Sequence, residues 1–139
     1  MIVLDTNVAS ELMRATPDHG VLNWIDKYPA TELFTTAITV AEVYFGIELL
    51  PRGKRREELL SLAEAIFDRD FLDRTLAFDA DSARIFSRIA AQRRGRGRPI
   101  SQSDAQIAAI VQRHGAMLAT RNIADFESCG IRLLDPWQS

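Results

Sequence analysis

The sequence predicts an α/β fold in which a central parallel sheet of about five strands lies between helices on both faces. Short apolar runs alternate with longer segments of helical spacing, and this order is typical of strands that run parallel. The chain has 139 residues, of which 47% are hydrophobic. This size suits one compact domain over residues 1–139 with a substantial core. We therefore expect a three-layer α/β/α arrangement.

The candidate strands are short and mostly apolar, as strands buried in a parallel sheet are. They span residues 2–4, 33–36, 75–77, 117–119 and 131–134. The candidate helices follow from apolar spacing of three and four residues and from helix-end signals. They span about residues 6–14, 16–28, 40–50, 55–67, 79–94 and 103–114.

Acidic residues fall at positions that this fold can bring together: Asp5, Glu42, Asp104 and Asp125. Each lies near the end of a predicted strand or the start of a helix, and sites in open parallel sheets form beyond the carboxyl ends of the strands. Two carboxylates about 5 Å apart repel by roughly 3 kcal/mol at an effective dielectric constant near 20. A cluster made only of oxygen donors therefore predicts a bound Mg²⁺ or Mn²⁺ ion.

Helix capping is the alternative explanation for these acids. Asp5 can cap the helix that follows it, Asp104 fits a capping box, and Asp125 is similarly placed. Glu42 differs, because it lies among apolar neighbours on its helix, where a charge needs a partner or a metal ion. Separate caps at one sheet edge explain the pattern less well than one shared site.

The cationic residues are mostly arginine. Only Lys27 and Lys54 are lysines among 17 Lys and Arg residues, and arginines cluster at 52–56 and 93–98. A guanidinium group can hold phosphate through two hydrogen bonds, but a solvated turn explains each cluster equally well. The net charge of −2 argues against nucleic-acid binding by bulk charge alone.

Several other classes of site are excluded by composition and spacing. The single Cys129 rules out a disulfide framework and suits a reducing cytosol. His19 and His114 have no metal-binding spacing, and no nucleophile elbow, Walker or Rossmann pattern occurs. Trp24 and Trp137 are expected to pack rather than to stack on bases. We see neither a signal peptide nor a membrane span, and we expect a cytoplasmic protein with no membrane partner.

Sequence blocks along nearly the whole chain occur in the order of one known family. They are LDTNV at 4–8, SELMR at 10–14, ITVAEV at 38–43, GI at 46–47, RPI at 98–100, DAQIAA at 104–109, TRNIADF at 120–126 and LDPW at 134–137. With these blocks the chain resembles the PIN-domain ribonucleases, specifically the VapC-type toxins of bacterial toxin–antitoxin systems. The resemblance implies a PIN-like three-layer fold.

The resemblance also implies roles for the acids in a catalytic metal site. Asp5 and Asp104 match the most direct ligands of Mg²⁺, with Mn²⁺ as the other candidate ion. Glu42 and Asp125 match residues that complete the site directly or through water.

Supporting residues are carried over in the same way. Thr6 and Thr120 match neighbours that hold the carboxylates or a bound water, and Asn122 matches a residue that fixes its loop. Residues 101–103 depart from the family, because many relatives carry a proline there. We expect this difference to alter the start of the helix rather than to remove activity.

The implied reaction is hydrolysis of RNA phosphodiester bonds by a metal-dependent endoribonuclease. Because acids at the centre repel the RNA backbone, we expect arginines at the rim: Arg98 first, then Arg96 and Arg121. The resemblance implies a cognate antitoxin that neutralises the toxin, a homodimer, a toxin–antitoxin hetero-oligomer, and operator DNA bound only through the antitoxin. The apolar helices between residues 39 and 67 are either ordinary core or a seam for one of these partners.

Other functions remain open at this point. The nearest alternative is a PIN-like subunit of a DNA-binding toxin–antitoxin repressor complex with little or no nuclease activity. A receiver-type phosphorylation module would need a lysine after the last strand, and both lysines come earlier in the chain. A haloacid-dehalogenase-like phosphatase would need a second Asp where this chain has Asn7.

Overall fold

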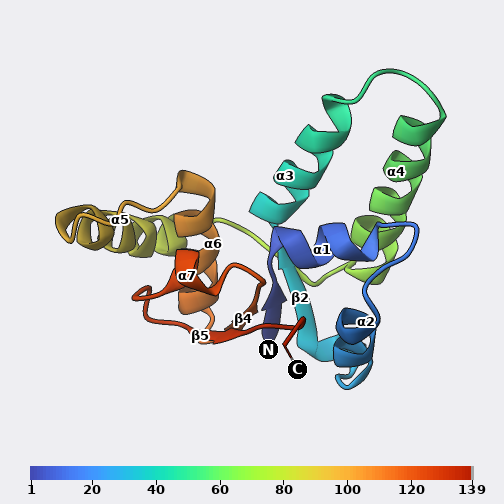
Figure 1. Cartoon of the computed structure of the whole chain (residues 1–139). Coiled ribbons are helices and arrows are strands. Elements are labelled where there is room, and N and C mark those ends of the chain that lie inside the picture. The colour runs from blue at the N-terminus through green and yellow to red at the C-terminus, as the bar shows by residue number, and fades with distance from the viewer. Residues whose placement is uncertain (139) are drawn as a thin grey trace.

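A sheet of five parallel strands forms the centre of the molecule in this computed structural model, which describes residues 1–138 (Figure 1). The strands are β1 (Ile2–Leu4), β2 (Leu33–Thr36), β3 (Thr75–Leu76), β4 (Met117–Ala119) and β5 (Arg132–Leu134). Their order in the sheet is β3-β2-β1-β4-β5. The predicted α/β class and parallel sheet are therefore confirmed. The single domain over residues 1–139 stays a prediction, and its last residue lies outside the described part.

Helices connect the strands and cover the sheet. They are α1 (Thr6–Leu12), α2 (His19–Asp26), α3 (Ala37–Glu48), α4 (Lys54–Glu64), α5 (Ala80–Gly95), α6 (Gln102–Arg113) and α7 (Ile123–Phe126). A 3-10 turn, η1 (Ala30–Glu32), precedes β2, and a π-helical turn, η2 (Ala65–Asp70), continues α4. The short α7 and both turns were not predicted, and α1 and α4 end earlier than expected. Within residues 1–138, no helix has both the length and the hydrophobicity needed to cross a membrane.

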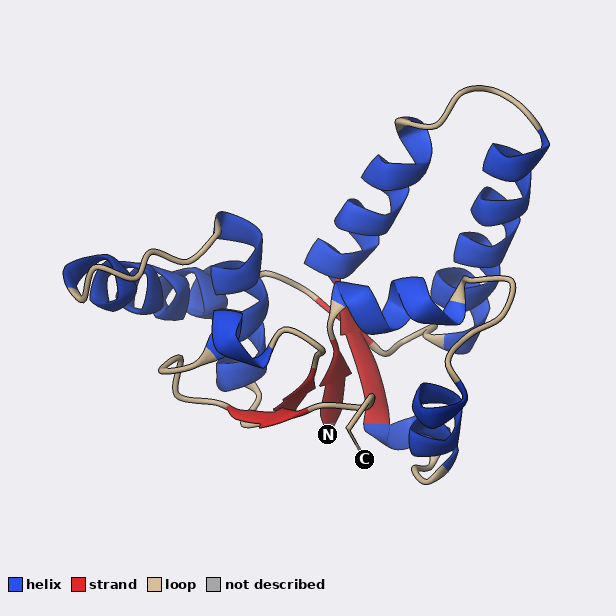
Figure 2. Ribbon diagram, viewed as in Figure 1, coloured by secondary structure: helices blue, strands red, loops and turns tan. Residues whose placement is uncertain are grey.

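The two faces of the sheet face different helices, because side chains alternate along a strand. Val3 belongs to a buried cluster with α5, α6 and α7. Ile2 and Leu4 belong to a second cluster with α1 and α2. Figure 2 shows the strands between these two groups of helices. The expected three layers, with helices on both faces, are confirmed.

The hairpin of α3 and α4 projects beyond the sheet (Figure 1). Its two helices share a third apolar cluster that includes Val43 and Ile47 of α3 and Ala63 of α4, together with Phe67 of η2. Phe45 on α3 is 65% exposed, and Leu49, which directly follows α3, is 69% exposed. The apolar surface expected between residues 39 and 67 is thus only partly used by the core.

The strand-to-helix junctions at the centre of the sheet are short. Asp5 directly follows β1 and is the N-cap of α1. Thr36 ends β2 and is the N-cap of α3, where its hydroxyl accepts a hydrogen bond from the Thr39 N–H at 3.0 Å. With no intervening loop, the first turns of α1 and α3 start at the same carboxyl edge of the sheet. These junctions determine where Asp5 and Glu42 lie.

Candidate active site

A cavity of about 490 Å³ lies at the carboxyl ends of β1 and β4. It is lined by Asp5, Thr6, Asn7, Ser10, Glu11, Arg14, Glu42, Asp104, Arg121, Asn122 and Trp137. Three of the expected acids, Asp5, Glu42 and Asp104, therefore meet at one cavity although they are far apart in the sequence. Asp125 does not line it.

Asp5 is the most buried acid of the cavity, with only 4% of its surface exposed. One carboxylate oxygen, Oδ1, accepts a hydrogen bond from the Thr6 N–H at 2.8 Å. The other, Oδ2, accepts from the Thr120 hydroxyl at 2.7 Å and from the Asn7 amide at 3.1 Å. Asp5 is therefore a helix cap whose carboxylate also faces the cavity, and its membership of one shared acidic site stays a prediction.

The pKa of Asp5 is raised from 3.8 to about 6, chiefly because burial penalises the charged form. Hydrogen bonds from Thr120 and Thr6 oppose this change, and the negative charges of Asp104 and Glu42 add to it. A carboxylate that remains buried next to like charges is typical of a functional site rather than of a simple cap.

Glu42 is held by a hydroxyl and not by a cation. The Thr6 hydroxyl donates to Glu42 Oε1 at 2.7 Å, and it lies 3.1 Å from the Thr39 hydroxyl. Thr39 is fully buried, so this chain of hydroxyl groups fixes the first turn of α3 against the first turn of α1. The expectation that Glu42 needs a partner is met by Thr6.

Asp104 lies in the first turn of α6 and is partly buried. The Ser101 hydroxyl accepts a hydrogen bond from the Asp104 N–H at 3.2 Å, which is one half of the expected capping box. The pKa of Asp104 is raised, first by burial and then by the negative charges of Asp125 and Glu42, while the Ser101 hydrogen bond and the charge of Arg93 lower it. Asp125 therefore lies close enough to act on Asp104 electrostatically, although it is exposed on α7.

Asn7 contacts the acidic cavity although the sequence motifs gave it no role. Its amide donates to Asp5, and its Oδ1 accepts from the Arg121 N–H at 3.2 Å. Thr120, which was expected to support the acids, is fully buried and donates to Asp5. The Thr120 hydroxyl also accepts from the Asn122 N–H at 3.0 Å. Asn7 comes two residues after Asp5 in the first turn of α1, and this spacing was the available signal.

The arginines expected to contact RNA occupy different positions. Arg121 lines the cavity, and its guanidinium lies 5.0 Å from the centre of the Trp137 ring. Arg98 pairs with Glu127 at 3.7 Å, and Arg96 is exposed at the end of α5. Neither of these two lines the cavity. Trp137 packs against the second core cluster, as expected, and also forms part of the cavity wall.

The match to a known family spans most of the molecule. The family model for the PIN domain matches residues 2–128. The chain belongs to the PIN-domain family.

Relatives of this PIN protein match over nearly their full length. VapC ribonuclease Y4jK of Sinorhizobium fredii is 43% identical over 138 residues, which are 99% of each chain. Toxin FitB of Neisseria gonorrhoeae is 35% identical, again over 99% of each chain. A solved structure of FitAB bound to the IR36 DNA fragment covers 99% of this chain and 96% of its own, with a TM-score of 0.91 and 35% identity. The expected place of the chain among VapC-type PIN toxins is confirmed.

The donor set of the PIN site suits a hard divalent cation, because the acids offer only carboxylate oxygens. Their arrangement is open: within residues 1–138, no three His, Cys, Asp or Glu side chains are grouped closely enough to hold an ion as they stand. Burial is the main cause of the raised pKa of Asp5, and the negative charges of Asp104 and Glu42 add to it.

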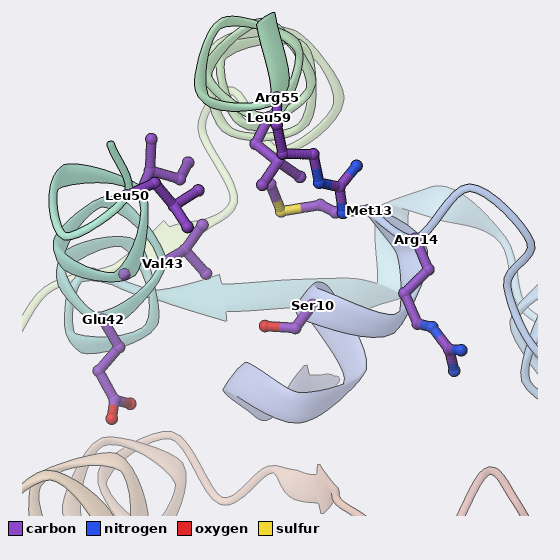
Figure 3. Close-up of a pocket in the computed structure, with 10 residues that line it drawn as sticks. Ser10, Met13, Arg14, Glu42, Val43, Leu50, Arg55 and Leu59 are labelled. Carbon is purple, nitrogen blue, oxygen red and sulfur yellow. The ribbon is translucent and has the colours of Figure 1, made fainter. Parts of the chain in front are cut away.

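A second, more apolar cavity of about 300 Å³ adjoins the acids. Much of its wall is apolar. The wall includes Met13 directly after α1, Val43 and Ile47 on α3, Leu50 just after α3, and Leu59 on α4. Figure 3 shows Glu42 at one end of this apolar groove and Leu50 and Leu59 at the other. A ligand that fills the groove would therefore lie next to the acidic cavity.

Proposed function

We propose that this PIN protein is a metal-dependent endoribonuclease and the toxin of a toxin–antitoxin pair. The observation that carries the proposal is the meeting of Asp5, Glu42 and Asp104 at one cavity, with Asp5 buried and its pKa raised to about 6. Such a group of acids is unfavourable on its own and becomes favourable when a cation is bound. The family membership supports the same function.

The proposed metal is Mg²⁺, with Mn²⁺ as an alternative. Asp5 and Asp104 would bind it directly, and Glu42 and Asp125 would complete the site directly or through water. A divalent ion supplies positive charge at the scissile phosphate and lowers the pKa of a bound water. Asp125, which is exposed on α7 and lies outside the cavity, is the acid best placed to act through water.

The other residues of the site orient these acids and the substrate. Thr6 holds Glu42, and Thr120 and Asn7 hold Asp5. Asn122 connects the loop after β4 to Thr120 through its backbone. Among the arginines, Arg121 is the best-placed phosphate contact, because it lines the cavity.

The proposed partners follow from the family and from the apolar groove. Complexes such as FitAcB from Neisseria gonorrhoeae, which matches with a TM-score of 0.88 and 33% identity, support a cognate antitoxin and a hetero-oligomer. We assign the groove between α1, α3 and α4 to an apolar segment of the antitoxin, since its occupant would lie beside Glu42. A homodimer and a cytoplasmic location, where RNA is available, complete the proposal.

A direct test is cleavage of RNA by the purified chain in buffer with controlled divalent ions. We expect cuts within the RNA that need Mg²⁺ or Mn²⁺, stop with EDTA, and leave 5′-phosphate ends. A DNA oligonucleotide of the same sequence is the matched control and should remain intact. Cleavage that persists in EDTA, or ends that carry a cyclic phosphate, would contradict a metal-dependent mechanism.

A DNA-bound complex is the second candidate function, and one observation favours it. The FitAB structure that matches with a TM-score of 0.91 is bound to DNA. We propose that the chain joins such a complex only through its antitoxin, and that nuclease activity belongs to the free toxin. A chain that lacks cleavage with all acids intact, yet is required for DNA binding by the complex, would favour the repressor role alone.

A further inference from the structure

Arg93 is a buried cation at the end of α5. Only 6% of its surface is exposed, whereas the other arginines of the run at 94–98 are exposed. The solvated-turn explanation of this arginine cluster therefore does not fit Arg93. Buried arginines are rare unless they are paired, and none of the ion pairs found within residues 1–138 includes Arg93.

Backbone carbonyl groups take the place of an acidic partner. Nε donates to the Arg98 carbonyl at 2.8 Å. Nη1 donates to the Asp125 carbonyl at 3.0 Å and to the Glu127 carbonyl at 3.1 Å, and it lies 3.5 Å from Cys129 Sγ. One guanidinium thus connects the turn before α6 to the segment formed by α7 and the residues after it.

These two segments carry the acids on one side of the site. The turn that ends near Arg98 leads into α6 and Asp104, and α7 carries Asp125. We infer that Arg93 is a positioning residue that sets the placement of Asp104 relative to Asp125, so that both can serve one reaction. The inference rests on the proposed nuclease function.

The charge of Arg93 supports this positioning role, in addition to the hydrogen bonds that it makes. It acts on Asp104 in the opposite sense to Asp125 and Glu42. Cys129 does not cancel this charge, because burial raises the pKa of its thiol and keeps it neutral. The buried guanidinium is therefore a fixed positive charge that acts on Asp104.

The closest alternative is direct contact with RNA, and it makes a different prediction. A buried side chain that fixes other groups affects the rate of the bound complex, whereas a phosphate contact affects RNA affinity. The test compares kcat and KM for RNA cleavage in Arg93→Lys and Arg93→Gln. Arg94→Gln is the control, because it removes a positive charge from the exposed neighbour on the same helix.

We expect Arg93→Lys to fold, because it keeps the buried charge but loses the planar fork of donors. Its kcat should fall by about 10- to 100-fold, since small misplacement of reacting groups costs about that much. KM should stay within about threefold of the wild-type value, because the substitution leaves the contacts with RNA unchanged. Amide hydrogen exchange should quicken in residues 97–101 and 123–129 of both Arg93 variants and not in Arg94→Gln.

Arg93→Lys with the kcat of the wild type, or with a raised KM and an unchanged kcat, would overturn the inference. Unchanged exchange in both segments would do the same. If neither Arg93 variant folds, the whole domain depends on Arg93 and a local positioning role is wrong. A wild-type chain that fails to cleave RNA would refute the proposed function, while the exchange data would still decide whether Arg93 holds the two segments.

Discussion

Asp5 has two roles that conflict energetically. It caps α1 and accepts hydrogen bonds from Thr6, Thr120 and Asn7, yet it is buried beside other acids. A pKa raised from 3.8 to about 6 corresponds to about 3 kcal/mol in favour of the neutral form. The folded protein therefore binds the Asp5 proton more tightly than the unfolded chain does. The stability this proton provides is complete below about pH 4 and is lost as the pH rises through about 6.

We expect Asp5→Asn to be more stable than the wild type at pH 7.5 in EDTA. The gain should be about 1–3 kcal/mol, because the amide has no charge to bury but fits the donors around it less well. It should shrink toward zero near pH 4, where Asp5 is protonated. Urea unfolding at a series of pH values measures the difference in the free energy of unfolding. A variant less stable than the wild type at pH 7.5 would contradict an unfavourable buried charge at Asp5.

Thr6 is the residue through which Glu42 is fixed. Thr6→Val keeps the shape but removes the hydroxyl that donates to Glu42 Oε1. We expect kcat to fall about tenfold, which corresponds to the loss of about one hydrogen bond of 1–1.5 kcal/mol. Thr6→Ser restores the hydroxyl and should recover most of the rate. Equal rates for Thr6→Val and Thr6→Ser would show that this hydrogen bond does not matter.

The sequence was informative about which acids to examine and less so about what surrounds them. Asp5, Glu42 and Asp104 were expected to converge, and they line one cavity. Asn7 and the buried position of Arg93 were missed. Sequence spacing places a residue on a strand or helix. It does not show that the Arg93 side chain is buried, because this depends on the carbonyl groups of Asp125 and Glu127, more than thirty residues away.

At the scale of elements, long periodic segments were predictable and short irregular ones were not. The strands and the cores of α3, α5 and α6 fall where apolar spacing placed them. The four-residue α7 is too short to show a helical period, and its N-cap, Asn122, makes no side-chain cap hydrogen bond. The π-helical turn η2 has no distinct sequence pattern, and the apolar spacing predicts instead an α-helix that continues to about residue 67.

The loops around the cavity determine which of the candidate RNA-binding arginines line it. Arg121 follows β4 and lines the cavity, whereas Arg98 is paired with Glu127 outside it. We expect Arg121→Ala to raise KM and to reduce the slope of log affinity against log salt by about one, as loss of one phosphate contact does. Arg98→Ala should have a smaller effect in the same direction. An unchanged salt slope in both variants would remove these arginines from the RNA-binding surface.

At the scale of the whole molecule, the apolar groove and the acidic cavity share Ser10, Arg14 and Glu42 in their walls. This continuity allows a partner in the groove to control access to the acids. We expect Leu50→Glu to weaken antitoxin binding at least about tenfold, because it places a charge in an apolar contact. RNA cleavage by the free toxin should be unchanged.

Leu72→Glu is the matched control, since Leu72 is 61% exposed and does not line the groove. Calorimetry should show weaker antitoxin binding for Leu50→Glu and not for Leu72→Glu, and co-expressed antitoxin should rescue growth less well only for Leu50→Glu. Equal antitoxin affinity in the two variants would place the antitoxin elsewhere on the molecule.

We propose that Asp5, Glu42 and Asp104, which meet at one cavity, form one metal-dependent RNA-cleaving site, with Asp125 on the neighbouring α7. The most direct measurement is the rate of RNA cleavage by wild type and Asp104→Asn, in buffer freed of metal and then supplied with known Mg²⁺ concentrations. We expect Mg²⁺-dependent cleavage by the wild type and a loss of at least about 100-fold in the folded variant, because a group essential to the transition state is removed. Wild-type rates in folded Asp104→Asn, or equal rates with and without Mg²⁺, would contradict this proposal.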